Sequence, residues 1–356
     1  MRIHLIYLCC LLTYNAFSQE KDWLFAFYNA DSTLVGYKNQ KDQVVIPANL
    51  NAFFGLPDKF QNIISVIENT DAQGIKQYFL TKNGLKVGFD SLHYFDNTPD
   101  CENEGFIRFH NRKTDKVGLL NADGEIQIPA EYSAMDIVKN GLITVLKGAQ
   151  RKSDGEHSYW VGGKSSLIDT NNNVIIEDFP ITTDLDFYNI LIDESIQDQS
   201  YWEKFKGVDG KIYSFINFEK EFKQHLEDQF SLEVRDELLN EMCFDTVTYW
   251  NEDTGWLKQN SLDFVADHLD KIEPILMSVM DGSADFFIST SHLNPFLFEG
   301  PAFQKFYNHC ADPMYWKYPV MDLIVNHDVN GNRSQSHLEF LRTEDGYKLI
   351  LFSLRI

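Results

Sequence analysis

The sequence predicts a mixed fold, with an all-β array of hairpins over residues 19–216 and an α+β module over residues 217–356. Three observations support this prediction. A hairpin pattern recurs in the first half, and the hydrophobic period changes from about two residues to about 3.6 near Asn217. Two strong hairpin signals then follow the helical stretch. The chain has 356 residues, 44% of them hydrophobic, which suits about two domains.

The N-terminal segment, residues 1–18, has the layout of a secretory signal peptide. Arg2 provides a positive charge, and the apolar run Ile3–Leu12 follows it. Ala16 and Ser18 place small side chains before the expected cleavage site. The apolar run is too short for a stable membrane anchor. The sequence therefore predicts an exported protein (periplasmic, outer-surface or extracellular) whose mature chain begins at Gln19. The alternative is a buried first helix or strand.

The charge balance restricts the classes of partner. Lysine and arginine number 31 against 53 aspartates and glutamates, which gives a formal net charge of −22. Such an acidic surface repels phosphate backbones and anionic membranes, so nucleic-acid binding through a basic surface is excluded. After the signal peptide, no stretch of about 18 apolar residues without a charged residue is present, so no transmembrane segment is predicted. The expected partner is a protein or a component of the cell envelope.

A hairpin pattern recurs along the N-terminal half. The clearest copy, Lys116–Tyr132, has an apolar strand with glycine at its third residue, a polar turn, and a strand that contains Ile-Pro-Ala. Val35–Leu50 shares this order, a truncated copy begins at Lys86, and a weaker copy spans Ser166–Ile176. We expect each copy to form a β-hairpin, with the prolines ending their strands because proline donates no ladder hydrogen bond. The structural positions of the pattern are Gly36, Pro47, Gly88, Gly118, Gly124 and Pro129.

The glycines are the most informative positions of this pattern. Gly36, Gly88 and Gly118 each follow a valine at the start of an apolar strand. A side chain is absent there either because φ is positive or because a neighbouring residue packs directly on the Cα atom. Asp123-Gly124 is expected to supply the positive φ angles of its turn. Asn172, in a turn of the weakest copy, is expected to tolerate substitution by serine.

The pattern resembles the WG-repeat family, whose unit runs lysine, tryptophan, glycine, an apolar pair, aspartate, a glycine turn, valine-isoleucine-proline and a tyrosine. The copy at Lys116–Tyr132 matches this unit best, with Val117 in the tryptophan position. The resemblance covers residues 24–216, with Gly207–Tyr213 as a degenerate last unit. It implies an all-β repeat surface and no catalytic residues.

The C-terminal module is predicted to begin with helices. Phe218, Phe222 and Leu226 recur every four residues, as they do in an amphipathic helix. Ser231 and Ser261 are expected to begin two further helices, because serine is a favourable N-cap residue.

The module is predicted to end with strands. Before them, Pro301 suits the first turn of a helix that would carry the apolar face of Phe303–Cys310. Asn330-Gly331 and Asp345-Gly346 are hairpin signals, so we expect an antiparallel three-stranded meander over Val320–Ile356. Helices followed by a meander loosely resemble NTF2-like cone folds, in which helices cover a curved sheet.

Three cysteines remain in the mature chain, namely Cys101, Cys243 and Cys310. An odd number excludes a complete disulfide framework. Two arrangements stay open. All three can be buried as small hydrophobic residues, or Cys243 and Cys310 can form one bridge, since both lie in the C-terminal half.

The sequence contains no catalytic motif. It lacks Gly-x-Gly-x-x-Gly, a P-loop and Gly-x-Ser-x-Gly, so it indicates no catalytic residue and no cofactor. The histidine spacing of a helical zinc site is also missing, so no metal site is predicted. The late histidines are interpreted as scattered surface or strand residues; they are His268, His292, His309, His327 and His337.

An acidic loop surrounds Cys101, with Asp100, Glu102 and Glu104 as its carboxylates. It is interpreted as a solvated loop, with weak cation binding as the alternative. The sequence as a whole favours a non-catalytic interaction protein. The competing hypothesis is a hydrolase or a small-ligand-binding protein with its site in residues 217–356. A polar cavity with paired histidine and carboxylate groups would favour an enzyme, and a filled apolar core would favour the interaction protein.

Overall fold

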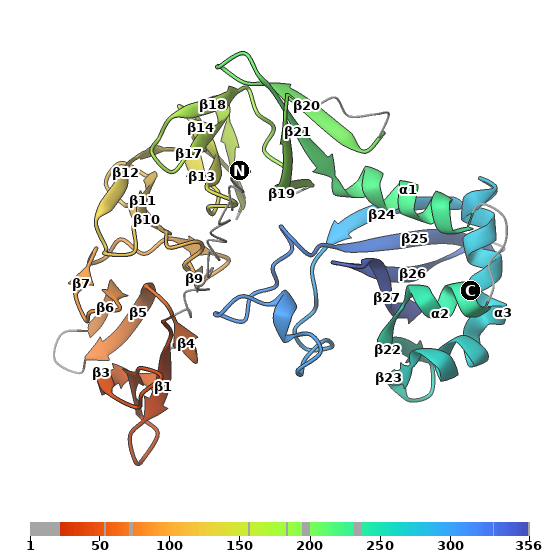
Figure 1. Ribbon diagram of the computed structural model, residues 1–356, viewed down its shortest axis with the longest axis horizontal. Coiled ribbons are helices and arrows are strands. Elements are labelled where there is room, and N and C mark those ends of the chain that lie inside the picture. The colour runs from red at the N-terminus through yellow and green to blue at the C-terminus, as the bar shows by residue number, and fades with distance from the viewer. Residues whose placement is uncertain are drawn as a thin grey trace, which may run out of the picture.

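The computed structural model describes residues 22–52, 55–70, 74–155, 157–182, 184–193, 200–230, 236–329 and 331–354. The predicted signal peptide and the predicted mature terminus at Gln19 lie outside these residues. The described chain is mostly β, with many small antiparallel hairpin sheets and a few helices. In Figure 1 the small sheets follow one another in an arc, which leads through a helix to a larger sheet.

The first half of the arc is made of short antiparallel sheets with the strand orders β3-β2-β1-β4, β5-β6-β7, β8-β9 and β10-β11-β12. Their bounds are β1 Leu24–Tyr28, β2 Leu34–Lys38, β3 Val44–Asn51, β4 Lys59–Phe60, β5 Ile63–Thr70, β6 Gly74–Thr81, β7 Lys86–Val87, β8 Tyr94–Phe95, β9 Thr98–Pro99, β10 Ile107–Asn111, β11 Lys116–Leu120 and β12 Ile126–Tyr132.

The second half continues with the orders β13-β14-β17-β18, β15-β16 and β19-β21-β20. The bounds are β13 Ala134–Met135, β14 Leu142–Lys147, β15 Gln150–Asp154, β16 His157–Val161, β17 Lys164–Asp169, β18 Val174–Glu177, β19 Leu185–Ile192, β20 Trp202–Lys206 and β21 Ile212–Asn217. Neighbouring sheets share buried side chains; Leu119 and Ile128, for example, cluster with Ile143 of the next sheet. This sharing is needed because a single hairpin cannot bury its own apolar face.

The same tight turn recurs along the arc. In each case the first residue's N–H donates to the fifth residue's carbonyl, the fourth residue's N–H donates to the first residue's carbonyl, and the fourth residue has positive φ. The first residues of these turns are Asn39, Thr81, Asn121, Asp169 and Gly207. The fourth residues, with their φ angles, are Asp42 (59°), Gly84 (80°), Gly124 (78°), Asn172 (67°) and Gly210 (86°). These residue types are the ones that adopt the left-handed region most readily.

Gly36 and Gly118 each face a β-bulge in the strand that follows the turn. The pairing register of β2 with β3 and of β11 with β12 shifts at these glycines. A Cβ atom added to Gly36 would lie 2.6 Å from the Ile46 carbonyl oxygen, and one added to Gly118 would lie 2.6 Å from that of Ile128. Glycine is required because the backbone of the bulge packs directly on its Cα atom.

Three expectations about the pattern are wrong in detail. Pro47 and Pro129 lie inside β3 and β12, in the stretches where the register shifts, rather than at strand ends; a bulge leaves an N–H unpaired, so proline costs no ladder hydrogen bond there. Gly88 has φ +60°, which is one of the two expected reasons for a glycine, but it directly follows β7 instead of opening a strand, so it is not equivalent to the other two glycines. In Asp123-Gly124 only the glycine has positive φ.

The C-terminal half contains a larger sheet with the order β23-β22-β27-β26-β25-β24, in which β22 and β27 are parallel and the other neighbours antiparallel. Its elements are α1 Phe218–Phe230, α2 Asp236–Met242, β22 Cys243–Asn251, β23 Gly255–Asn260, α3 Ser261–Met280, β24 Asp285–Ser291, β25 Val320–Val329, β26 Asn332–Thr343 and β27 Gly346–Ser353. The three helices cover one face, where Phe222, Phe264 and Phe340 belong to one buried apolar core.

The helix starts differ from the sequence expectations in part. The first helix begins at Phe218, next to the predicted boundary. The third begins at Ser261, but Asn260 is its N-cap and accepts a hydrogen bond from the Asp263 N–H. Ser231 lies outside the described residues. The prediction of a helix after Pro301 is wrong, because only a short 3₁₀ turn, η2 Gln304–Phe306, forms there. Aromatic side chains in that segment pack in a cluster without helical periodicity.

Candidate functional site

Residues 292–319, here called the excursion, connect β24 to β25 and reach the inner side of the arc (Figure 1). They rest on the sheet face opposite the helices, where Phe298 and Phe306 cluster with Val320, Leu341 and Ile350. The excursion has little regular structure, so this apolar cluster holds it in shape.

The tip of the excursion is a turn over residues 308–312 with the same hydrogen bonds as the turns of the arc. The Asn308 N–H donates to the Asp312 carbonyl, and the Ala311 N–H donates to the Asn308 carbonyl. The Asn308 Oδ1 atom accepts from the Cys310 and Asp312 N–H groups, each at 2.9 Å. Ala311, in the fourth position, has φ 65°. The excursion therefore presents an arc-like turn to the arc.

A disulfide joins Cys101 of the arc to Cys310 of this turn, across 209 residues of sequence. Both sequence expectations, three free cysteines and a Cys243–Cys310 bridge, are therefore wrong. Cys243 is a free thiol, buried beneath the helices, and its burial raises its pKa to about 12. The expectation of a Cys243–Cys310 bridge depends on the closeness of these residues in the sequence. The excursion instead places Cys310 beside Cys101, in the first half of the chain.

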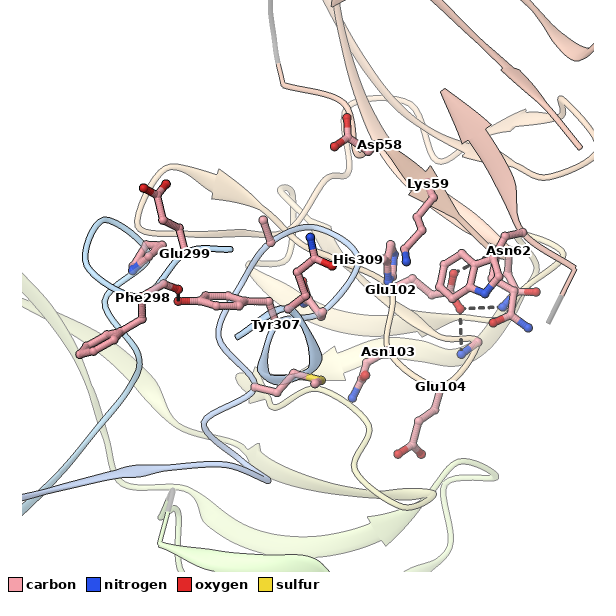
Figure 2. A pocket seen from close by; sticks show the side chains of 18 of the residues that line it. Asp58, Lys59, Asn62, Glu102, Asn103, Glu104, Phe298, Glu299, Tyr307 and His309 are labelled. Atoms are coloured by element: carbon pink, nitrogen blue, oxygen red, sulfur yellow. Dashed lines mark hydrogen bonds between the residues drawn. The ribbon is translucent and has the colours of Figure 1, made fainter. Parts of the chain in front are cut away.

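Beside the disulfide, the arc and the excursion enclose a cleft of about 960 Å³ (Figure 2). Asp58, Lys59 and Asn62 lie on the arc side of this cleft. Glu299 and Tyr307 lie on the excursion side, and the Tyr307 hydroxyl donates to the Phe298 carbonyl at 2.9 Å. The cleft thus has two walls that are distant in sequence and joined by one covalent bond.

Glu102 is a buried carboxylate of this cleft, only 6% exposed. It accepts hydrogen bonds from the Asn62 side chain at 2.6 Å and from the backbone N–H groups of Asn62, Ile63 and Gly105 at 3.0–3.3 Å. Burial raises the pKa of Glu102, and these hydrogen bonds offset only part of that effect. The carboxylate is directed at Asn62, Ile63 and Gly105, so it ties its own loop to the start of β5 rather than facing a bound molecule.

The other two carboxylates of the acidic loop hold other parts of the arc. Arg108 makes a bidentate pair with Asp100, at 2.5 and 2.9 Å. Glu104 accepts hydrogen bonds from the N–H groups of Asn140 and Gly141, at 2.7 and 2.8 Å, and from the Tyr188 hydroxyl at 2.9 Å. The loop is therefore a connector between sheets, and neither a freely solvated loop nor a cluster of carboxylates open to a cation.

An aromatic group lies at the arc side of the cleft. The rings of Trp23 and His309 are 5.6 Å apart between centroids, and the Lys59 ammonium lies 5.2 Å from the Trp23 ring. Sequence reasoning misses this group, because Trp23 falls outside the hairpin copies and His309 resembles the other late histidines. Its only sequence signal is the adjacency of His309 and Cys310.

The cleft has an acidic balance. Asp58 and Glu299 are exposed on its two walls, and Lys59 is the basic side chain among its lining residues. Together with the net charge of −22 for the whole chain, this balance favours a positively charged group in the cleft over an anion.

A second polar group lies on the excursion side of the large sheet. Asp322 and Glu339 are directly opposite each other on β25 and β26. The His337 Nδ1 atom is 2.9 Å from an Asp322 carboxylate oxygen, and the other Asp322 oxygen is buried without a hydrogen bond among the described residues. Burial, and secondarily Asp322, raise the pKa of Glu339 to about 7. His337 is a strand residue of β26, as the sequence interpretation allows, and it is paired with an acidic side chain.

None of the six positions predicted from the hairpin pattern lines the cleft; their roles are in the strands and turns of the arc. The residues that do line it are Trp23 and residues from segments 58–62 and 102–105 and from the excursion.

Comparisons with protein-family models, with curated proteins and with solved structures give no match for this chain. Within the described residues, no helix combines the length and the apolar character that crossing a membrane requires.

Proposed function

We propose that this protein is an exported, non-catalytic interaction protein whose cleft binds a basic segment of a protein or cell-envelope partner. One observation carries the proposal. The cleft joins two distant parts of the chain through Cys101–Cys310, and the hydrogen bonds of its buried carboxylate, Glu102, all go to the protein's own Asn62, Ile63 and Gly105. A general acid or base must instead reach a proton of the substrate.

The chemistry of the walls supports a basic partner. Asp58 and Glu299 are exposed on opposite walls, so a lysine or arginine between them would meet a carboxylate on either side. The Trp23 ring also lines the cleft, where it already carries the Lys59 ammonium at 5.2 Å, so a basic segment would compete with Lys59 for this ring.

The test uses the full-length protein as bait on the envelope fraction of the native host. Captured chains are then purified and their direct binding is measured. We expect the double variant Asp58→Lys, Glu299→Lys to bind the identified partner at least about 10-fold more weakly, because each reversed charge repels a basic segment.

The matched control is Glu252→Lys, Asp253→Lys, which makes the same change of net charge on the turn between β22 and β23, away from the arc (Figure 1). It should bind as the wild type does. Equal binding by both double variants would contradict the cleft as the binding site.

A specific observation favours a second candidate, a hydrolase with its site on the large sheet. His337 paired with Asp322 is an arrangement that can activate water, and one Asp322 oxygen is buried without a hydrogen bond among the described residues. The wild type is assayed against esters, amides and glycosides beside Asp322→Asn. Turnover that the variant abolishes would favour this candidate, and the absence of turnover in the wild type would favour the interaction protein.

We also propose the finer architecture that the sequence suggests, a WG-type repeat array over residues 19–216 and an α+β module over 217–356 that ends in a meander. Five turns with the same hydrogen bonds, roughly 40 residues apart, support the repeat. Export is tested by mass spectrometry of protein from the native host, where we expect a terminus at or near Gln19.

A further inference from the structure

Three metal-ligating side chains meet where the excursion touches the arc. The ligand atoms of Cys101, His309 and Cys310 all lie within 4.8 Å of one another, and all three residues are partly exposed. All three residues line a separate hollow of about 370 Å³. We propose that, when the disulfide is reduced, these three residues bind one soft divalent metal ion, such as Zn²⁺, through two thiolates and one imidazole.

The distances suit a tetrahedral ion. Zinc lies about 2.3 Å from sulfur and about 2.0–2.1 Å from nitrogen, which places neighbouring ligand atoms about 3.4–3.8 Å apart. The Cys101 Sγ atom is already 3.4 Å from the His309 Nε2 atom. The two sulfur atoms must separate, which they can do when the bond between them is broken, and the His309 Nε2 and Cys310 Sγ atoms already lie within 4.8 Å of each other. Water from the hollow can fill the fourth position.

Both sides of the site are held by interactions that do not depend on the disulfide. Asn308 fixes the turn that carries His309 and Cys310, through hydrogen bonds at 2.9 Å. Glu102, next to Cys101, is fixed by its hydrogen bonds to Asn62 and Gly105. Each side therefore keeps its shape when the bond is reduced, and little ordering within either side is needed for a metal ion to bind.

Asp312 lines the hollow beside the cysteines, and Asp100 is already paired with Arg108. The choice of ion therefore depends on the ligand atoms. Two thiolates and an imidazole select zinc over magnesium or calcium, which prefer oxygen ligands.

The chemistry balances with a dithiol as the reductant. The dithiol gives two electrons and two protons to the Cys101–Cys310 bond and is itself oxidised to a disulfide. The two protein thiols then release two protons as they bind the ion as thiolates, and neutral His309 contributes its Nε2 lone pair.

The test uses the full-length chain, reduced without oxygen and freed of the dithiol. Zinc affinity is measured by competition with a chromogenic chelator, and Co²⁺ is added as a spectroscopic probe of thiolate ligation. We expect one tightly bound Zn²⁺ per reduced chain, none in the oxidised chain, and visible thiolate bands with Co²⁺. His309→Ala should weaken zinc binding by on the order of 100-fold.

Cys243→Ser is the matched control, because Cys243 is buried away from the site; it should bind zinc like the wild type. If Cys101→Ser fails to fold, alkylation of the reduced wild type serves as the test instead. Bound zinc should protect Cys101 and Cys310 from the alkylating reagent. Zinc binding by Cys101→Ser equal to that of the reduced wild type, or alkylation of both cysteines at unchanged rates, would overturn the proposal. Neither result depends on the partner of the cleft.

Discussion

At the scale of single residues, the clearest constraint is the absence of a side chain at Gly118. The backbone of the β12 bulge and the Phe109 ring occupy the space that a Cβ atom would need, each within 2.6 Å of it. We predict that Gly118→Val lowers the free energy of unfolding by about 2–4 kcal/mol, through strain and overpacking. Urea unfolding of the variant and the wild type measures this difference.

Gly84→Asn is the control for that variant. Gly84 has φ +80°, and no atom of another part of the chain lies within 4 Å of the place that a Cβ atom would take. Asparagine occupies the equivalent turn position at residue 172. The cost of Gly84→Asn should stay below about 1 kcal/mol, because asparagine tolerates the left-handed region. Equal urea midpoints for Gly118→Val and the wild type would show that β12 does not pack on this glycine.

Glu339 predicts a pH dependence of stability. Its pKa is raised from 4.5 to about 7 by burial, so the folded state binds this proton more tightly than the unfolded state does. Its contribution is therefore most favourable below about pH 4.5 and is lost as the pH rises towards 7. Glu339→Gln should match the wild type near pH 4.5 and exceed its stability at pH 8 by up to about 3 kcal/mol. A variant less stable than the wild type at pH 8 would contradict this expectation.

At the scale of elements, the turns of the arc also join neighbouring hairpins. The Asn172 side chain accepts a hydrogen bond from the Tyr132 hydroxyl at 2.6 Å and donates one to Glu131 at 3.0 Å. Its φ is 67°. The expected tolerance of Asn172 is therefore revised, and we predict that Asn172→Ser costs about 1–2 kcal/mol in thermal or urea unfolding.

Asp123→Ser is the control variant. Asp123 lies in the neighbouring turn and takes no part in the hydrogen bonds that join Asn172 to Tyr132 and Glu131. This substitution should lower the free energy of unfolding by less than about 0.5 kcal/mol. A double-mutant cycle of Asn172→Ser with Tyr132→Phe should give a coupling energy, because the two residues share one hydrogen bond. Additive effects would mean that the turn and the preceding hairpin are independent.

What can be predicted from the sequence is local. The hairpin signals around Lys116–Tyr132 and the period of Phe218, Phe222 and Leu226 depend on neighbours in the chain, and β11, β12 and α1 lie where these patterns indicate. The aromatic residues of the excursion are spaced like a helix face, which predicts a helix, but they pack on β25–β27 instead. The cleft cannot be predicted, since it depends on the return of Cys310 to Cys101.

At the scale of the whole molecule, the two halves have separate apolar clusters but are linked at their junction. No cluster of buried residues in the described chain includes side chains from both sides of residue 217. Across the junction, Arg342 pairs with Asp186 at 2.9 Å, and it also pairs with Glu221 on its own side. The junction is therefore mainly polar.

We predict that a fragment beginning between residues 210 and 220, with Cys310→Ser, folds on its own. Its length of about 140 residues is sufficient for an independent core. A cooperative urea transition and protected amides in the sheet are the expected results, and the full chain with Cys310→Ser is the control. A fragment without a cooperative transition would mean that the two halves need each other to fold.

The bond between Cys101 and Cys310 has a further consequence for the integrity of the chain. It closes a covalent ring across 209 residues that contains the second half of the arc, helices α1–α3 and strands β22–β24 of the large sheet. A protease that cuts one exposed loop inside this ring opens the backbone without releasing a fragment. Such a nicked chain would migrate as two pieces only after reduction, so the protein can lose a peptide bond and still keep both walls of its cleft in one molecule.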